Sequence, residues 1–149
     1  MEARALWWLS RLKPAASNPN RHAYGNAMTR VLVVDDEVDI RYVLAYVLAD
    51  EGYDVDQASD GVSALELIER RHPDIIILDM KMPGMDGWEF AKLYRERYGN
   101  RAPIIVLTAA QDAARRGTEI MADSYVPKPF DLDVLLEHVA AIVRSMGTD

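Results

Sequence analysis

Short apolar runs recur along this chain, and each of the clearest ones leads directly into a polar residue. These runs are VLVV at 31–34, DIIILD at 74–79 and PIIVLT at 103–108. A short, nearly continuous apolar run is typical of a strand buried on both faces of a parallel sheet. Weaker strand patterns occupy residues 53–58 and 124–126. We therefore expect five strands.

Amphipathic stretches with helical spacing separate these runs. Residues 40–48 place apolar side chains along one helix face, and Gly52 ends the pattern. Asp86 and Asp131 are expected to cap two later helices. The segment from Ala109 to Met121 has poor periodicity, and its helix is the weakest pattern. Strands that alternate with helices imply a parallel sheet covered on both faces, with right-handed crossovers.

Composition limits the class of protein. A chain of 149 residues with 50% hydrophobic and 28% charged side chains is expected to form one folded domain. The net charge is −7, but residues 1–28 hold four basic side chains against Glu2 alone, so they carry +3 and the remainder carries −10. An acidic body argues against direct nucleic-acid binding. Without cysteine there is no disulfide, thiolate metal site or thiol nucleophile.

The N-terminal extension, residues 1–28, allows two interpretations. MEARALWWLSRLK is compatible with a short amphipathic helix that touches a partner or a membrane surface, with Leu6, Leu9 and Leu12 on one face. Alternatively, the extension is disordered and Met28 is the natural start. Its apolar run is too short to span a bilayer, so we expect a soluble, cytoplasmic protein with its domain over 29–146 and a tail at 147–149.

Polar residues follow four of the five expected strands. Asp35 and Asp36 end the first, Asp79 the third and Thr108 the fourth, while Lys128 follows the fifth. In such sheets ligands bind outside the carboxyl ends of the strands. Each residue alone has an ordinary explanation as a helix cap, turn former, strand residue or solvated charge. Three carboxylates, a hydroxyl and an ammonium at one edge together indicate a functional site.

The chemistry of this set points to a cation and to phosphoryl transfer. Like charges ~4 Å apart repel by ~4 kcal/mol near a protein surface, so clustered carboxylates favour a bound cation. An all-oxygen ligand set suits Mg²⁺ better than Ca²⁺ or Zn²⁺. A carboxylate is also a nucleophile toward phosphorus. If Asp79 attacks, then Mg²⁺, Lys128 and the Thr108 hydroxyl would stabilise the transferring group.

Four motifs resemble the receiver domain of bacterial two-component response regulators. They are VLVVDDE at 31–37, DIIILDMKMPGMDG at 74–87, PIIVLTA at 103–109 and ADSYVPKPF at 122–130. The resemblance extends from Met28 to about Met146. It implies a flavodoxin-like (βα)5 fold, a doubly wound parallel sheet with strand order 2-1-3-4-5, like that of single-domain chemotaxis regulators.

The same resemblance implies roles at the site. Asp79 would accept a phosphoryl group from the histidine of a sensor kinase or phosphotransfer protein. Asp36 and Asp79 would bind Mg²⁺ directly together with the backbone carbonyl of Lys81, while Asp35 acts mainly through water. Lys128 would pair with the phosphoryl oxygens. A cis peptide bond would precede Pro129.

The resemblance also implies a switch. The Thr108 hydroxyl would move toward the phosphoryl group and Tyr125 would turn inward, which biases the surface of the fourth helix, fifth strand and fifth helix. Tyr125 is alternatively an ordinary strand tyrosine. The chain departs from the family pattern because the span from Thr108 to Lys128 is about two residues short and Met121 replaces a usual glycine. Lys81 and Ala110 stand where phosphoryl lifetime is tuned.

We expect a single-domain phosphorylation switch without an output domain. It would catalyse only its own phosphorylation and dephosphorylation, act on another protein, and be a monomer or a phosphorylation-dependent dimer. One rival is a phosphatase of the haloacid dehalogenase type, which needs an Asp two residues after the nucleophile and a Thr or Val two further on. Those positions hold Lys81 and Pro83. The other rival is a receiver-like module that is never phosphorylated, against which the complete acid set argues.

Overall fold

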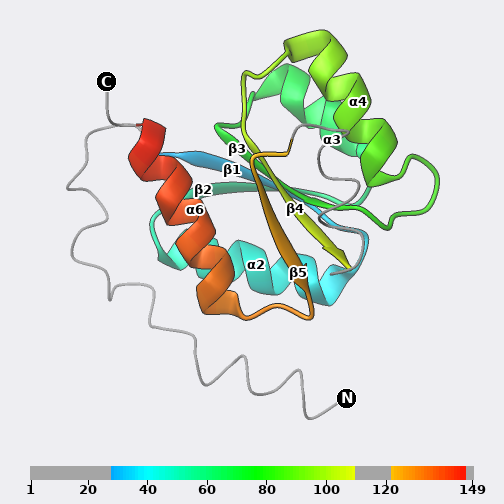
Figure 1. The fold of residues 1–149 in the computed structure, drawn as a ribbon. Coiled ribbons are helices and arrows are strands. Elements are labelled where there is room, and N and C mark those ends of the chain that lie inside the picture. The colour runs from blue at the N-terminus through cyan, green and yellow to red at the C-terminus, as the bar shows by residue number, and fades with distance from the viewer. Residues whose placement is uncertain (1–27, 110–121, 147–149) are drawn as a thin grey trace.

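The structure is a computed structural model that describes residues 28–109 and 122–146. Strands and helices alternate along these two ranges (Figure 1). The elements are β1 (Arg30–Val34), α2 (Val38–Asp50), β2 (Asp54–Ala58), α3 (Gly61–Arg70), β3 (Ile75–Asp79), α4 (Gly87–Tyr98), β4 (Ile104–Ala109), β5 (Ser124–Lys128) and α6 (Leu132–Met146). The expectations for residues 1–27, 110–121 and 147–149 lie outside the described residues.

All five strands are parallel, and their order is β2-β1-β3-β4-β5. This confirms the flavodoxin-like, doubly wound sheet. The three continuous apolar runs form β1, β3 and β4, the inner strands, where every residue of β3 is buried. The more polar DVDQA sequence of β2 lies at one edge, where it is only partly covered.

Two layers of helices cover the sheet (Figure 1). Side chains of β3 alternate between the faces, so Ile76 and Leu78 pack with α3 and α4, while Ile75 and Ile77 pack with α2 and α6. Phe90 of α4 is fully buried in the first core. The sheet therefore separates two hydrophobic cores, and its strand ends form a common edge for both.

Two strand boundaries differ from the sequence prediction. The fifth strand was expected to stop at Val126, but β5 continues through Pro127 to Lys128. A proline is tolerated because β5 is an edge strand, which leaves one side of its backbone without a sheet partner. Ala109, expected to open a helix, is instead the last residue of β4 and pairs with Lys128.

The predicted caps are confirmed. The Asp86 carboxylate accepts a hydrogen bond of 2.9 Å from the Glu89 N–H, and Asp131 accepts one of 2.8 Å from the Asp133 N–H. Gly99 ends α4 with a φ of +63°, a conformation that favours glycine. Across the described ranges, no helix combines the length and apolarity that crossing a membrane requires.

Candidate functional site

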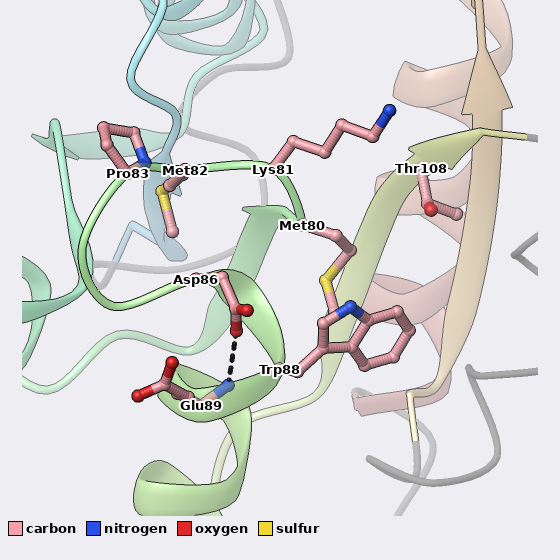
Figure 2. Close-up of a pocket in the computed structure, with 8 residues that line it drawn as sticks. All are labelled: Met80, Lys81, Met82, Pro83, Asp86, Trp88, Glu89 and Thr108. Atoms are coloured by element: carbon pink, nitrogen blue, oxygen red, sulfur yellow. Dashed lines mark hydrogen bonds between the residues drawn. The ribbon is translucent and has the colours of Figure 1, made fainter.

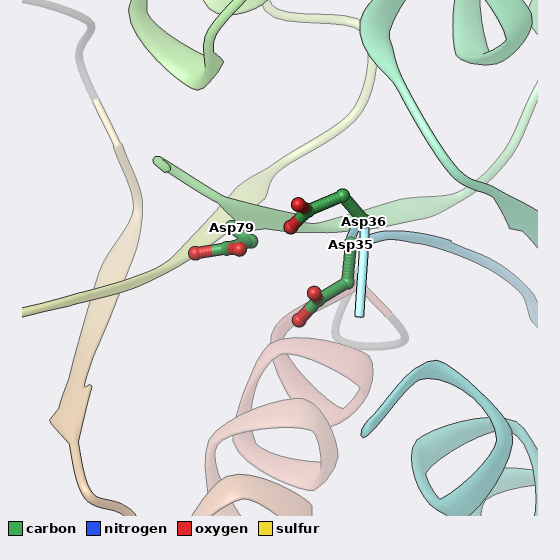
Figure 3. A group of neighbouring side chains, drawn as sticks. All are labelled: Asp35, Asp36 and Asp79. Atoms are coloured by element: carbon green, nitrogen blue, oxygen red, sulfur yellow. The ribbon is translucent and has the colours of Figure 1, made fainter. Parts of the chain in front are cut away.

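Three carboxylates meet at the carboxyl ends of β1 and β3. These strands are neighbours, so Asp35 and Asp36 after β1 lie beside Asp79 at the end of β3 (Figure 3). One oxygen from each of the three lies within 4.8 Å of the others. Asp35 is fully buried and Asp79 is 2% exposed, whereas Asp36 is exposed. The structure thus brings together the three acids that the sequence singled out.

Asp35 is held by its own loop. Its Oδ1 accepts a hydrogen bond of 2.9 Å from the Glu37 N–H, and its backbone carbonyl accepts one of 2.8 Å from Arg41. Its Oδ2 is buried and has no hydrogen-bond partner among the described residues. Burial raises the pKa of Asp35 to about 6; the Glu37 N–H opposes the rise and the charge of Asp79 adds to it.

Asp79 is anchored through one carboxylate oxygen. Its Oδ1 accepts a hydrogen bond of 2.9 Å from Lys128 Nζ and one of 3.3 Å from the Lys81 N–H. Lys128 reaches it from the end of β5, and the following peptide bond to Pro129 is cis. Among the described residues, both hydrogen bonds to the Asp79 carboxylate reach Oδ1 and none reaches Oδ2.

The acid cluster fits a hard cation. The three donor atoms that meet here are carboxylate oxygens, and the buried Oδ2 of Asp35, without a partner among the described residues, is a polar atom that a hydrated ion would satisfy. One lysine offsets only part of the charge of three acids. Mg²⁺ prefers few carboxylates and several waters, which matches this set.

Thr108 and Tyr125 lie on β4 and β5, the two strands that follow the Asp79 strand in the sheet. Thr108 is 6% exposed and follows Leu107, the register partner of Asp79. Tyr125 is half-buried and packs against the core under α3 and α4. By strand alternation the two side chains face the same side of the sheet, because Val106 pairs with Tyr125 and lies two residues before Thr108.

A cleft of about 760 Å³ opens between the loop after β3, the start of α4 and Thr108 (Figure 2). Its lining includes residues that sequence reasoning did not single out: Met80, Met82, Trp88 and Glu89. The available signal was position, since all four lie within the ten residues that follow Asp79. Met80 and Met82 are buried and Trp88 is half-buried, which depends on packing that spacing alone does not reveal.

Comparison with known proteins gives a consistent result. A family model described as the response regulator receiver domain matches residues 31–140. The response regulator MprA of Mycobacterium sp. (strain KMS) is 43% identical over 122 residues, which covers 80% of this chain and 53% of that protein. MprA of Mycobacterium leprae is 42% identical over the same length. The chain spans about half the length of these curated relatives.

Solved structures agree with this result. The chemotaxis protein CheY4 of Vibrio cholerae is 36% identical and superposes with a TM-score of 0.72, covering 77% of this chain and 98% of CheY4. The receiver domain of the Francisella response regulator 1452 is 31% identical with a TM-score of 0.73, covering 79% of this chain and 98% of that domain.

Proposed function

This chain belongs to the response regulator receiver domain family, and on that premise we propose that Asp79 accepts a phosphoryl group from the histidine of a sensor kinase or phosphotransfer protein. Phosphoacceptance is general for the family, and membership implies such a donor. One observation carries the assignment to Asp79: it is the nearly buried carboxylate that lies between the other acids and the Lys128 ammonium.

The chain's own groups divide the work of the transfer. Asp79 Oδ2 attacks phosphorus, while Lys128 and the Lys81 N–H hold Oδ1 and fix the orientation of the carboxylate. The bond from phosphorus to the donor imidazole breaks, and its electron pair stays on that nitrogen. Lys128 and the Thr108 hydroxyl donate to the phosphoryl oxygens as charge develops on them.

The metal assignment follows from the donor set. Asp36, Asp79 and the backbone carbonyl of Lys81 would hold Mg²⁺, with Asp35 acting through water. When bound, the ion supplies positive charge that offsets the acids and the phosphoryl oxygens. The outer role for Asp35 is supported by its buried Oδ2, which lacks a partner among the described residues and could accept from a water of the ion.

The proposed output is a change in surface. Thr108 and Tyr125 lie on one side of the sheet, so movement of Thr108 toward a phosphoryl group would free space for the tyrosine ring. The altered surface would recruit another protein. The chain itself would be either a monomer or a phosphorylation-dependent dimer. We propose no enzymatic action on other substrates. Single-domain status and cytoplasmic location stay predictions.

Intact mass spectrometry tests the proposal. The purified chain is incubated with Mg²⁺ and acetyl phosphate, and we expect a gain of one phosphoryl group that disappears without the ion. Asp79→Asn should gain none. Asp39→Asn, which removes an exposed acid of α2 a few residues from the cluster, is the matched control and should behave like the unaltered chain.

The same assay distinguishes the two rival functions. A phosphatase would release free phosphate continuously without accumulating a modified chain. A module that is never phosphorylated would show neither product. Modification of Asp79→Asn at the same rate as the unaltered chain would show that another residue is the acceptor.

A further inference from the structure

Helix α2 exposes an apolar row on its solvent side. Val38, Tyr42 and Tyr46 are 50%, 60% and 47% exposed, and their spacing of four residues places them one above another on the helix. The other large, exposed apolar side chains among the described residues are Met28, Val62, Val134 and Met146. No two of those four lie within one helical turn of each other. A contiguous row of this kind marks a contact surface.

Asp50 continues the same spacing and ends the row. It is only 7% exposed, and its Oδ1 is buried without a hydrogen-bond partner among the described residues. A buried carboxylate oxygen without a partner is costly, and here the C-terminal end of the helix dipole adds repulsion. A cation would remove both costs. We call Val38, Tyr42, Tyr46 and Asp50 the α2 row.

We propose that the chain's own N-terminal segment, residues 1–13, covers the α2 row. The segment carries Trp7 and Trp8 beside three leucines, which suit the exposed tyrosines, and three basic residues against one acid. Arg11 or Lys13 supplies the cation for Asp50. The remainder of the chain after residue 28 carries −10, so attraction between the two parts also favours docking.

The tether has the required reach. The described structure begins at Met28, and the Thr29 carbonyl accepts a hydrogen bond of 2.9 Å from the Asp54 N–H, four residues after α2 ends. The chain therefore enters near Asp50. A connection of 14 residues, the length of 14–27, has a typical end-to-end distance of ~20 Å, about the length of α2. Such a tether gives a millimolar effective concentration, so a weak contact is sufficient.

Paramagnetic relaxation tests this docking on the full chain. The chain has no cysteine, so Ser10→Cys carries a single nitroxide label. We expect loss of amide peak intensity along α2 and none along α4, which covers the opposite face of the sheet. Asp50→Asn should restore much of the intensity. Glu66→Gln, an exposed acid of α3, is the matched control and should restore none.

Two results would overturn the proposal. Intensities along α2 that match those along α4 would show that the segment does not cover the row. Loss that appears only when isotope-labelled chain is mixed with spin-labelled chain lacking the isotope would assign the row to a second copy. Because the row is separate from Asp79, either result would leave phosphoacceptance intact.

Discussion

At the scale of single residues, the acid cluster is held against its own repulsion. Asp35 shows the cost most directly, since burial and the charge of Asp79 raise its pKa to about 6. Asp36 is the exposed member and meets solvent first. A cation that enters here binds the folded chain and not the unfolded one, so it must stabilise the fold.

Magnesium should therefore raise the melting temperature, and Asp36→Asn should remove most of that rise. At ten times the dissociation constant, the stabilisation amounts to ~1.4 kcal/mol. Differential scanning fluorimetry with and without Mg²⁺ measures it, and Asp39→Asn serves as control. An equal rise in both variants would contradict the assignment of Asp36 as a ligand.

His72 should make stability depend on pH. Its Nδ1 contacts the Pro73 carbonyl at 2.9 Å and so carries the proton, which leaves Nε2 to accept from the Tyr94 hydroxyl at 3.0 Å. Burial, and then the charge of Arg101, lowers the pKa of His72 below its usual 6.5, although Asp74 opposes this. The unfolded chain therefore binds a proton first, and stability falls as pH drops from 6.5 through the folded-state pKa.

Urea unfolding between pH 5 and pH 7.5 measures this loss. His72→Gln keeps an acceptor for the Tyr94 hydroxyl but does not titrate, so the part of the slope that His72 contributes should vanish. The comparison uses the difference between the two curves because Asp35 also titrates in this range. Parallel curves would contradict the prediction.

At the scale of elements, the junction between β3 and α4 depends on one close approach. A Cβ on Gly87 would lie 2.7 Å from Met80 Cα and 2.8 Å from the Asp79 carbonyl oxygen. The Gly87 N–H also donates to the Met80 carbonyl at 3.2 Å. The first turn of α4 thus packs directly on the backbone that carries Asp79.

Gly87→Ala should lower the free energy of unfolding by ~1–3 kcal/mol, because backbone rather than a flexible side chain must move. It should also slow phosphoacceptance by shifting Asp79. Gly61→Ala is the control, since its Cβ would meet only the flexible Met85 side chain, and we expect a smaller loss. Chemical denaturation measures the free energy of unfolding of both variants, and equal losses in the two would contradict this prediction.

Elements with strong local signals were predictable, and their ends were less so. The inner strands and the caps at Asp86 and Asp131 follow from apolar runs and capping residues. The end of β5 could not be predicted in this way. A proline stops most strands, and Pro127 is permitted because β5 lies at the edge of the sheet. Edge position is a property of the whole sheet, so local sequence does not contain it.

At the scale of the whole molecule, the site is assembled from strands far apart in sequence. Lys128 and Asp79 are 49 positions apart, yet strand order brings their side chains to 2.9 Å. Polar residues at strand ends predicted that meeting. The buried, unpartnered oxygens of Asp35 and Asp50 were not predictable, since they depend on how loops and helices pack around them.

Lys128 connects the acid cluster to β5, and thereby to Tyr125 three residues earlier. We expect Lys128→Ala to accept a phosphoryl group but to lose most of the resulting amide shifts along β5 and α6. Amide spectra before and after acetyl phosphate treatment measure this. Shifts of unchanged size would show that Lys128 does not transmit the change.

The unequal bonding of the two Asp79 oxygens has a regiochemical consequence. A free carboxylate is symmetric, and a half-turn about its terminal bond exchanges its oxygens. Here Lys128 and the Lys81 N–H break that symmetry, because both contact Oδ1. An acyl phosphate formed at this position would then carry its mixed-anhydride bond on a single, predetermined oxygen, with the regiochemistry decided before any donor arrives.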